Sequence, residues 1–139
     1  ANNDSGTGTE DTNLTLSVTA NDTDVDNTIT SITGLTQPST GGTVSITGST
    51  NVLFVPTPDY CTSTLITFTY RAVDASGSLS NIATGSIIVN CTNDAPVAVN
   101  DSNTTNRNTN VTTFVLANDT DIDHPVSGLS VTGVTSITG

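Results

Sequence analysis

Two short acidic runs carry the side chains of this sequence that are best suited to chemistry. Each run places aspartate at alternate positions, and the six residues are Asp22, Asp24, Asp26, Asp119, Asp121 and Asp123. In an extended segment alternate side chains project to the same side, where their mutual repulsion favours a hard cation with oxygen ligands such as Ca²⁺. An EF-hand loop is excluded, because its glycine position holds Asn27 or His124. The spacing predicts a calcium site in each run; the alternative is that these residues only cap turns and keep the surface soluble.

The two runs are copies of one motif in a tandem repeat. Residues 20–26 return almost unchanged as residues 117–123, which gives a period of 97 residues. A repeat of this length suits a domain that closes its own core. The acidic segment 93–97 interrupts the pattern, and Pro96 breaks strand continuity there. We therefore expect one complete repeat over residues 1–95 and the N-terminal part of a second over residues 96–139.

The composition narrows the possible partners. The 139 residues carry two Lys and Arg against thirteen Asp and Glu, a formal net charge of -11. Such an acidic chain is a poor partner for nucleic acid or an anionic membrane. No apolar run approaches the length needed to cross a bilayer. We expect an extracellular protein with a thin aliphatic core, no nucleic-acid partner and no membrane insertion.

Apolar residues alternate with polar ones over many short runs, which is the pattern of half-buried strands. In the clearest run, residues 65–73, Ile66, Phe68 and Tyr70 share one face. Further strands are expected at residues 14–20, 29–35, 43–46, 52–55 and 82–89. Clusters of turn-forming residues separate these runs, and nothing has the period of a helix. The pattern predicts an all-β fold, an antiparallel sandwich of immunoglobulin or cadherin type.

Two cysteines, Cys61 and Cys91, lie near the beginning and end of the second half of the complete repeat. In a chain of this composition we expect a disulfide between them rather than two unrelated thiols. Closing that loop would stabilise the repeat by about 3 to 4 kcal/mol in the chain-entropy account. The bond would also indicate an oxidising, extracellular compartment.

Several short motifs together resemble a known family. They are Val18-x-Ala20-Asn21-Asp22-Thr23-Asp24, Gly42-Thr43-Val44, Phe54-Val55-Pro56-x-x-Asp59-Tyr60, Phe68-x-Tyr70-x-x-x-Asp74-x-x-Gly77 and Asn93-Asp94-Ala95-Pro96-Val97. As a set they resemble the tandem bacterial immunoglobulin-like, cadherin-like repeats of giant secreted and surface-attached proteins. The resemblance implies an extracellular spacer, adhesin stalk or matrix component without catalytic activity. It also implies further calcium ligands near the domain junction, whereas Cys61 and Cys91 depart from the usual pattern of the family.

Covalent glycans are a further expectation. Asn-x-Ser/Thr sequons suit a secreted chain, and six are predicted as glycosylation sites: Asn3, Asn13, Asn90, Asn100, Asn103 and Asn110. Two more sequons, at Asn21 and Asn118, lie inside the acidic motif, where a glycan and an ion would compete for space. In an organism without N-glycosylation all of them are ordinary turn residues.

The partial second repeat has counterparts of the first strands but none of segments 54–56 or 68–70. Alone it would expose apolar strand faces and unpaired edges. We expect the rest of the chain or a neighbouring chain to complete it, and completion between chains would give a head-to-tail homopolymer. Phe114 and Leu116 replace Ser17 and Thr19, so they form an assembly patch if they point outward, unless a local bulge turns them inward.

The sequence favours a structural function over catalysis. The single histidine, His124, lies in an Asp-rich turn, and no serine or cysteine has a recognisable nucleophile setting. The leading hypothesis is a repeat unit of an extracellular, glycosylated fibril or filament assembled head to tail. The alternative is a stalk or carbohydrate-binding segment of a large adhesin that recognises surface glycans. Only two tyrosines and no tryptophan are available for stacking on sugars.

Overall fold

The computed structural model describes residues 1–124 and 126–135. Backbone contacts divide the chain into two compact units, Ala1–Thr92 and Asn93–Gly139, which we call the first and second units. The boundary expected from the sequence lies after Ala95. Among the described residues, no helix has the length and apolar character that a membrane span requires.

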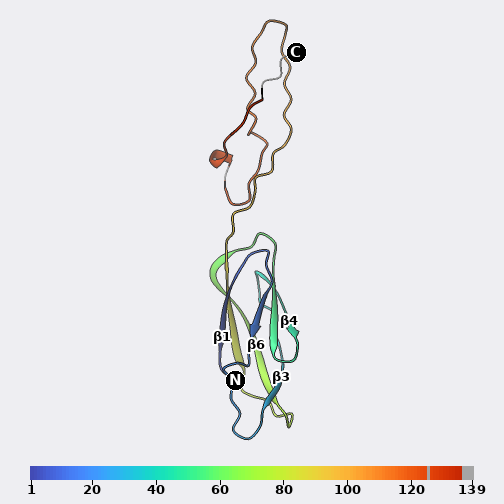
Figure 1. Ribbon diagram of the computed structural model, residues 1–139, viewed down its shortest axis with the longest axis vertical. Coiled ribbons are helices and arrows are strands. Elements are labelled where there is room, and N and C mark those ends of the chain that lie inside the picture. The colour runs from blue at the N-terminus through green and yellow to red at the C-terminus, as the bar shows by residue number, and fades with distance from the viewer. Residues whose placement is uncertain (125, 136–139) are drawn as a thin grey trace. The chain divides into compact units, whose positions relative to one another are not determined.

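The first unit consists of two β-sheets packed face to face (Figure 1). The larger sheet has the strand order β1 (Asp4–Thr9), β7 (Ala83–Asn90), β6 (Thr62–Asp74) and β3 (Ile29–Thr33). The smaller sheet has the order β2 (Leu14–Ser17), β5 (Asn51–Pro56) and β4 (Gly42–Thr47). The expected all-β fold is therefore confirmed, and six of the seven strands overlap the predicted ranges.

The remaining strand, β1, was not expected, and it corrects the prediction of a purely antiparallel sandwich. It pairs with β7 in parallel, from Asp4 opposite Gly85 to Thr9 opposite Asn90, whereas the other paired strands are antiparallel. Its sequence alternates glycine with serine and threonine and carries no apolar side chain. A strand of that composition leaves no hydrophobic period to detect.

The core lies between the sheets and is built mainly from alternating residues of β5, β6 and β7. Phe68, Tyr70 and Ile87 are each at most 1% exposed. Gly85 lies opposite Phe68 in the β6–β7 ladder, and a Cβ atom there would lie only 2.1 Å from Phe68 Cζ. The aromatic ring therefore occupies the space above a glycine, which explains why this strand position has no side chain.

Turn chemistry ends the strands where the sequence predicts. Gly77 has a φ of 86° in the turn after β6, a left-handed conformation that favours glycine. The buried carboxylate of Asp74 accepts hydrogen bonds from the amides of Ser76 and Ser78 at 2.9 and 2.6 Å in the same turn. Asp74 is therefore committed to closing this turn.

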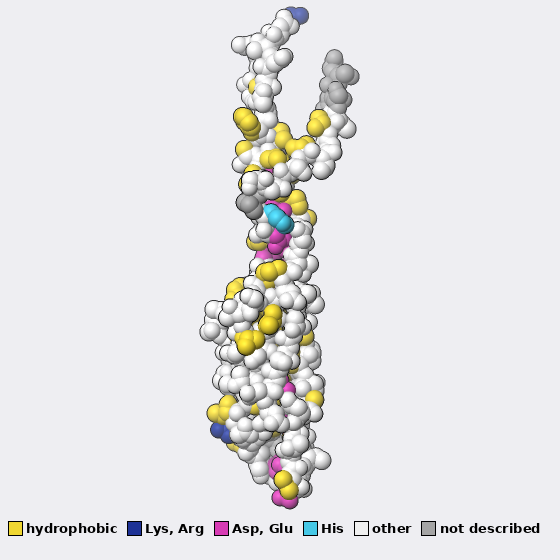
Figure 2. Space-filling view, turned by 90° about the vertical axis from the view of Figure 1, so that its left-hand side faces the viewer, with side chains coloured by type: hydrophobic (Ala, Val, Ile, Leu, Met, Phe, Trp, Pro, Cys, Tyr) yellow, Lys and Arg dark blue, Asp and Glu magenta, His cyan; other side chains and the backbone are white. Residues whose placement is uncertain are grey.

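The described residues of the second unit form no β-ladder. They contain one isolated bridge, between Val97 and Thr120, and one short 3-10 helix, η1 (Val126–Gly128). In the first unit Val18 is fully buried, whereas its counterpart Val115 is 42% exposed. Apolar side chains are prominent on the visible surface of the second unit, and mostly uncharged polar groups cover that of the first (Figure 2).

Candidate functional site: the acidic turn of each unit

The acidic motif adopts the same turn in both units. In the first unit the amide of Ala20 donates to the Ser17 carbonyl at 3.4 Å, and the next such bond, from Asp22, is 3.2 Å long. In the second unit Ala117 donates to the Phe114 carbonyl at 3.2 Å, followed by an equivalent bond from Asp119. These positions differ by the 97-residue period, so the repeated sequence gives a repeated backbone.

The first aspartate of each motif binds the backbone at the beginning of its own unit. Asp22 Oδ1 accepts a hydrogen bond from the Asn2 amide at 2.6 Å. Asp119 Oδ1 accepts the equivalent bond from the Val99 amide at 2.8 Å. A carboxylate that accepts a backbone N–H forms one of the stronger hydrogen bonds available to a protein.

The asparagine before that aspartate adds a second bond to the same segment. Asn21 Nδ2 donates to the Asn3 carbonyl at 3.1 Å, and Asn118 Nδ2 donates to the Asn100 carbonyl at 3.4 Å. We call this Asn-Asp pair, with its two bonds, the clasp. It fastens the first residues of each unit to a turn about twenty residues later.

The second aspartate of each motif caps its own turn. Asp24 Oδ1 accepts hydrogen bonds from the amides of Asp26 and Asn27 at 3.0 and 2.7 Å. Asp121 Oδ1 repeats this arrangement with the amides of residues 123 and 124. Capping of this kind is a common role of aspartate in turns and needs no ion. Turn capping, the alternative weighed from the sequence, therefore occurs in both motifs.

The geometry for a cation differs between the two motifs. Among the described residues, Asp121, Asp123 and His124 each offer a ligand atom within 4.8 Å of the others, whereas the three aspartates of the first motif do not form such a group. In the first motif Asp22 Oδ2 is shielded from solvent and accepts no hydrogen bond from the described residues. Calcium prefers oxygen ligands, so Asp121 and Asp123 fit it and the imidazole does not.

A buried tyrosine in the first unit joins the clasp to the larger sheet. The Tyr70 hydroxyl, on β6, lies 3.0 Å from the Asn2 carbonyl, 2.7 Å from Asp4 Oδ2 and 2.5 Å from the Val18 carbonyl. Burial, followed by the hydrogen bond to Asp4, raises the pKa of Tyr70, so the phenol stays protonated. Burial also raises the pKa of the Asp4 carboxyl, an effect that the hydrogen bond from Tyr70 opposes.

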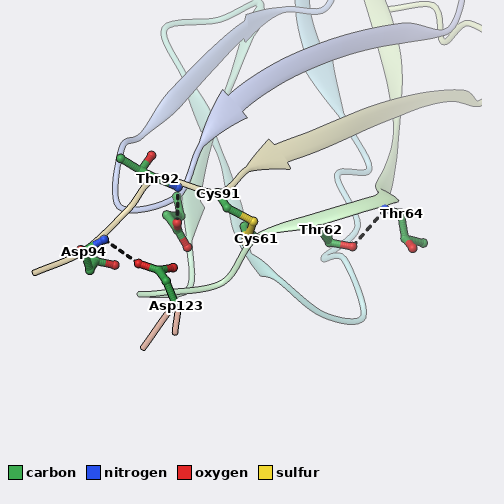
Figure 3. Close-up of a disulfide and its surroundings, with 8 residues drawn as sticks. Cys61, Thr62, Thr64, Cys91, Thr92, Asp94 and Asp123 are labelled. Atoms are coloured by element: carbon green, nitrogen blue, oxygen red, sulfur yellow. Dashed lines mark hydrogen bonds between the residues drawn. A yellow bond between two sulfur atoms is a disulfide. The ribbon is translucent and has the colours of Figure 1, made fainter. Parts of the chain in front are cut away.

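The predicted disulfide between Cys61 and Cys91 is present, and it lies beside the last strand of the first unit (Figure 3). Its two Cα atoms are 4.9 Å apart, and it joins the residue before β6 to the residue after β7. Next to it the amide of Thr92 donates to Glu10 Oε1 at 2.5 Å, and the Glu10 amide donates to the Asn90 carbonyl at 3.0 Å. The exit of the first unit is therefore tied both covalently and by hydrogen bonds.

The predicted glycosylation sites are all exposed; they are Asn3, Asn13, Asn90, Asn100, Asn103 and Asn110. The side chains of two of these asparagines already form hydrogen bonds. Asn3 Oδ1 accepts a hydrogen bond from the Thr84 amide at 2.9 Å, and Asn103 Nδ2 donates to Thr113 Oγ1 at 3.1 Å. A glycan on either nitrogen would have to share the side chain with these contacts.

The two residues expected to form an assembly patch have different environments. Phe114 is 80% exposed, while Leu116 is half-buried. The carbonyls of Phe114 and Leu116 accept the same turn hydrogen bonds as those of Ser17 and Thr19, so the backbones of the two copies correspond at this point. Both residues line one apolar hollow with Val126 and Val131.

Three residues of the first unit have structural roles that were not predicted from the sequence. Glu10, Tyr70 and Asp74 are buried polar groups, at 4%, 0% and 8% exposure. Tyr70 follows the apolar alternation of its strand, which predicts burial but not the partners of its hydroxyl. A glutamate at the end of a Gly/Thr strand gave no signal at all.

The structure thus defines the class of this protein: a β-sandwich unit followed by a second unit that repeats its polar motif, the backbone clasp. The first unit matches the family model of the bacterial cadherin-like domain over residues 1–91. The second matches the family model of the bacterial Ig domain over residues 93–139. The chain belongs to the bacterial cadherin-like domain family and continues into a bacterial Ig domain. It matches no curated protein and no solved structure.

The two families agree with the resemblance found in the sequence. Both are non-catalytic domains of a kind typical of surface and secreted adhesin-type proteins. Together with the disulfide they indicate an extracellular surface protein. The acidic clusters of the chain could bind Ca²⁺, as in cadherin-like domains.

Proposed function

We propose that this chain is a repeat segment of an extracellular, glycosylated fibril or filament that is assembled head to tail. The observation that supports this function most directly is the clasp, which recurs at the repeat period and binds only its own unit. The geometry shared by the two units thus serves to build each unit rather than to hold a substrate. If the function of the chain is to form an array of repeats, the polar motif is expected to make hydrogen bonds within each unit.

Electron microscopy of the native material tests this proposal. A fibril-forming repeat should appear as long regular filaments labelled along their length by an antibody to the first unit. Discrete particles would contradict the fibril and favour the other adhesin-type role, a stalk or carbohydrate-binding segment. Binding of the isolated chain to a glycan array would then separate the stalk from the carbohydrate-binding segment.

Head-to-tail self-association is the partner that we propose. It is supported by the exposed apolar residues of the second unit, among them Phe114 and Val115. The counterpart of Val115 in the first unit is Val18, which is buried inside a complete sandwich. Sedimentation of the 139-residue chain over a range of concentrations tests it. The chain should associate, Val115→Asp should abolish association, and Val25→Asp, at a 99% exposed position of the first unit, should not. A monomer at every concentration would contradict completion between chains.

Calcium binding is proposed for the acidic turns. Asp121 and Asp123 would supply oxygens in the second unit, and the unpartnered Oδ2 of Asp22 would do so in the first. If so, EDTA should lower the melting temperature and added Ca²⁺ should restore it. Asp123→Asn should reduce this response, with Asp101→Asn as the matched exposed control. A melting curve unchanged by EDTA would contradict calcium binding.

Covalent glycans are proposed at the exposed sequons. An intact mass above the 14.1 kDa of the polypeptide would support them, and peptide mapping would assign the sites. Asn13 is the most accessible site to test, because it lies in the loop before β2 and is exposed. A native mass equal to that of the polypeptide would rule glycosylation out.

A further inference from the structure

The first and last strands of the first unit lie side by side and run in the same direction. Six residue pairs join them, from Asp4 opposite Gly85 to Thr9 opposite Asn90. In a parallel pair the chain enters at one end of the ladder through β1 and leaves at the other end through β7. Tension between residues 1 and 92 therefore pulls the two strands past each other along their length.

Such sliding loads all the backbone bonds of the ladder together. Hydrogen bonds in a parallel ladder are evenly spaced between the strands, so none of them opens first when the strands slide. The clasp and the Glu10 bonds lie at the two ends of the same path, at Asn2 and at Thr92. Forced unfolding follows the unfolding rate, and breaking many bonds in one step makes that rate low.

The disulfide lies where the chain leaves the first unit, at the end of the segment that carries the tension. Tension that arrives at Cys91 reaches Cys61 directly through the covalent bond, which spans a sequence separation of 30. The loop that it closes contains both β6 and β7, the strands that form the middle of the larger sheet. Once β1 has separated from β7, the segment 1–61 can be extended by the force. Residues 62–90 carry no force, because the disulfide transmits it directly from Cys91 to Cys61.

We propose that the β1–β7 ladder is a shear clamp that resists tension on the repeat, and that the Cys61–Cys91 bond limits how far the repeat lengthens when the clamp fails. The repeat then yields in two parts, a strand-by-strand extension of β1 to β5 and a protected β6–β7 hairpin. That hairpin presents the edges on which β1 and β3 pair, so it is a ready template for refolding. This inference rests on the proposed role in an extended array, where tension is the expected load.

The direction of pulling tests the clamp. Single chains are held at residues 1 and 92 by site-specific handles, or at residues 1 and 82, with the full 139-residue chain in both cases. With handles at residues 1 and 82, the force acts on the beginnings of both strands. It therefore separates the residue pairs of the ladder one at a time, beginning at Asp4. The unfolding force should be several-fold higher for handles at 1 and 92. Equal forces in the two geometries would overturn the clamp.

The length released tests the bypass. With handles at 1 and 92, a phosphine reductant should lengthen the fully extended chain by about 100 Å, since 30 residues add roughly 3.3 to 3.6 Å each. Refolding after a stretch should be at least several-fold faster for the oxidised chain, and equal refolding rates would overturn the template role. The reductant acts on the wild-type chain, so the test does not depend on a cysteine variant that folds. A native protein that forms no filaments would contradict the proposed function and leave both readouts unchanged.

Discussion

The two units begin with the same clasp but differ in what the clasp fastens. In the first unit Asp22 ties the entering segment to a turn that also contacts Tyr70 through the Val18 carbonyl, deep in a closed sandwich. In the second unit Asp119 makes the same bond, yet the described residues around it form no sheet. The clasp therefore forms within a short stretch of sequence, because the residues joined by its aspartate are 20 positions apart in both units. The sandwich requires strands that lie far along the chain.

One pair of positions shows how far the two copies have diverged. In the first unit a Cβ on Gly6 would lie 2.9 Å from Leu16 Cδ1, so the glycine makes room for a large apolar side chain. The corresponding residues of the second unit are Asn103 and Thr113, which share a hydrogen bond of 3.1 Å. An apolar contact has become a polar one at the same place. The segments of the second unit that correspond to β1 and β2 therefore rely less on hydrophobic packing.

The disulfide makes the largest difference between the units. Replacing both cysteines, Cys61→Ser and Cys91→Ser, should lower the free energy of unfolding of the first unit by about 3 to 4 kcal/mol, because a closed 30-residue loop restricts the unfolded chain. Denaturant titration of the full chain measures this loss. Reductant should destabilise the wild type by the same amount and leave the variant unchanged. A loss below about 1 kcal/mol would show that the bond contributes little.

A glycine-to-alanine change should have a large effect in the packed core of the first unit and a small effect in the second unit. Gly85→Ala should destabilise the first unit by about 1 to 3 kcal/mol, because its Cβ would meet the ring of Phe68 at 2.1 Å. Gly133→Ala is the matched change in the second unit, where no atom lies within 4 Å of the added Cβ. That variant should change stability by less than about 0.5 kcal/mol. Similar melting temperatures for the two variants would contradict the packing described for β6 and β7.

The clasp should matter in both units. Asp22→Ala should cost the first unit about 1 kcal/mol, less than a full charged hydrogen bond, because the change also removes repulsion with Asp4. Asp119→Ala should expose the Val99 amide to hydrogen exchange without affecting the first unit. Asp26→Ala, at an exposed position, is the control and should be nearly neutral. If Asp26→Ala costs as much as Asp22→Ala, the clasp has no special role.

The smallest expected effect is the pH dependence of the first unit through Asp4. Its pKa is raised in the folded state above the ordinary value of 3.8, so the folded unit holds the proton more tightly than the unfolded chain. The corresponding stability is present at low pH and is lost as the pH rises from 3.8 through the folded pKa. Asp4→Asn should flatten this slope in melting curves recorded across that interval. If the substitution leaves the slope of stability against pH unchanged, titration of other groups causes that slope.

The sequence predicted the strands whose side chains alternate and failed where they do not. Residues 65–73 were recognised as a strand because Ile66, Phe68 and Tyr70 recur with the period of two that burial on one face requires. Strand β1 was missed because its inward positions are occupied by Asp4, Gly6 and Gly8, none of which is a large apolar residue. The parallel pairing of β1 could not be deduced, since a local pattern does not specify which distant strand provides the edge.

The candidate site was found from the sequence, but its role was only half recognised. The 97-residue repeat identified the right residues, because identical spacing gave identical turns. The partners of Asp22 and Asp119 lie twenty residues earlier in the chain, and no spacing rule places them there. The same holds for Tyr70, whose hydroxyl partners come from two other segments, residues 2–4 and Val18.

Amide hydrogen exchange of the 139-residue chain, read residue by residue, tests the central claim that one local clasp serves a closed unit and an open one. The account predicts that the Asn2 and Val99 amides are both protected relative to their neighbours. It also predicts slow exchange throughout β6 and β7 and fast exchange over residues 101–110. Fast exchange at Val99, or protection of residues 101–110 as strong as that of β1, would contradict it.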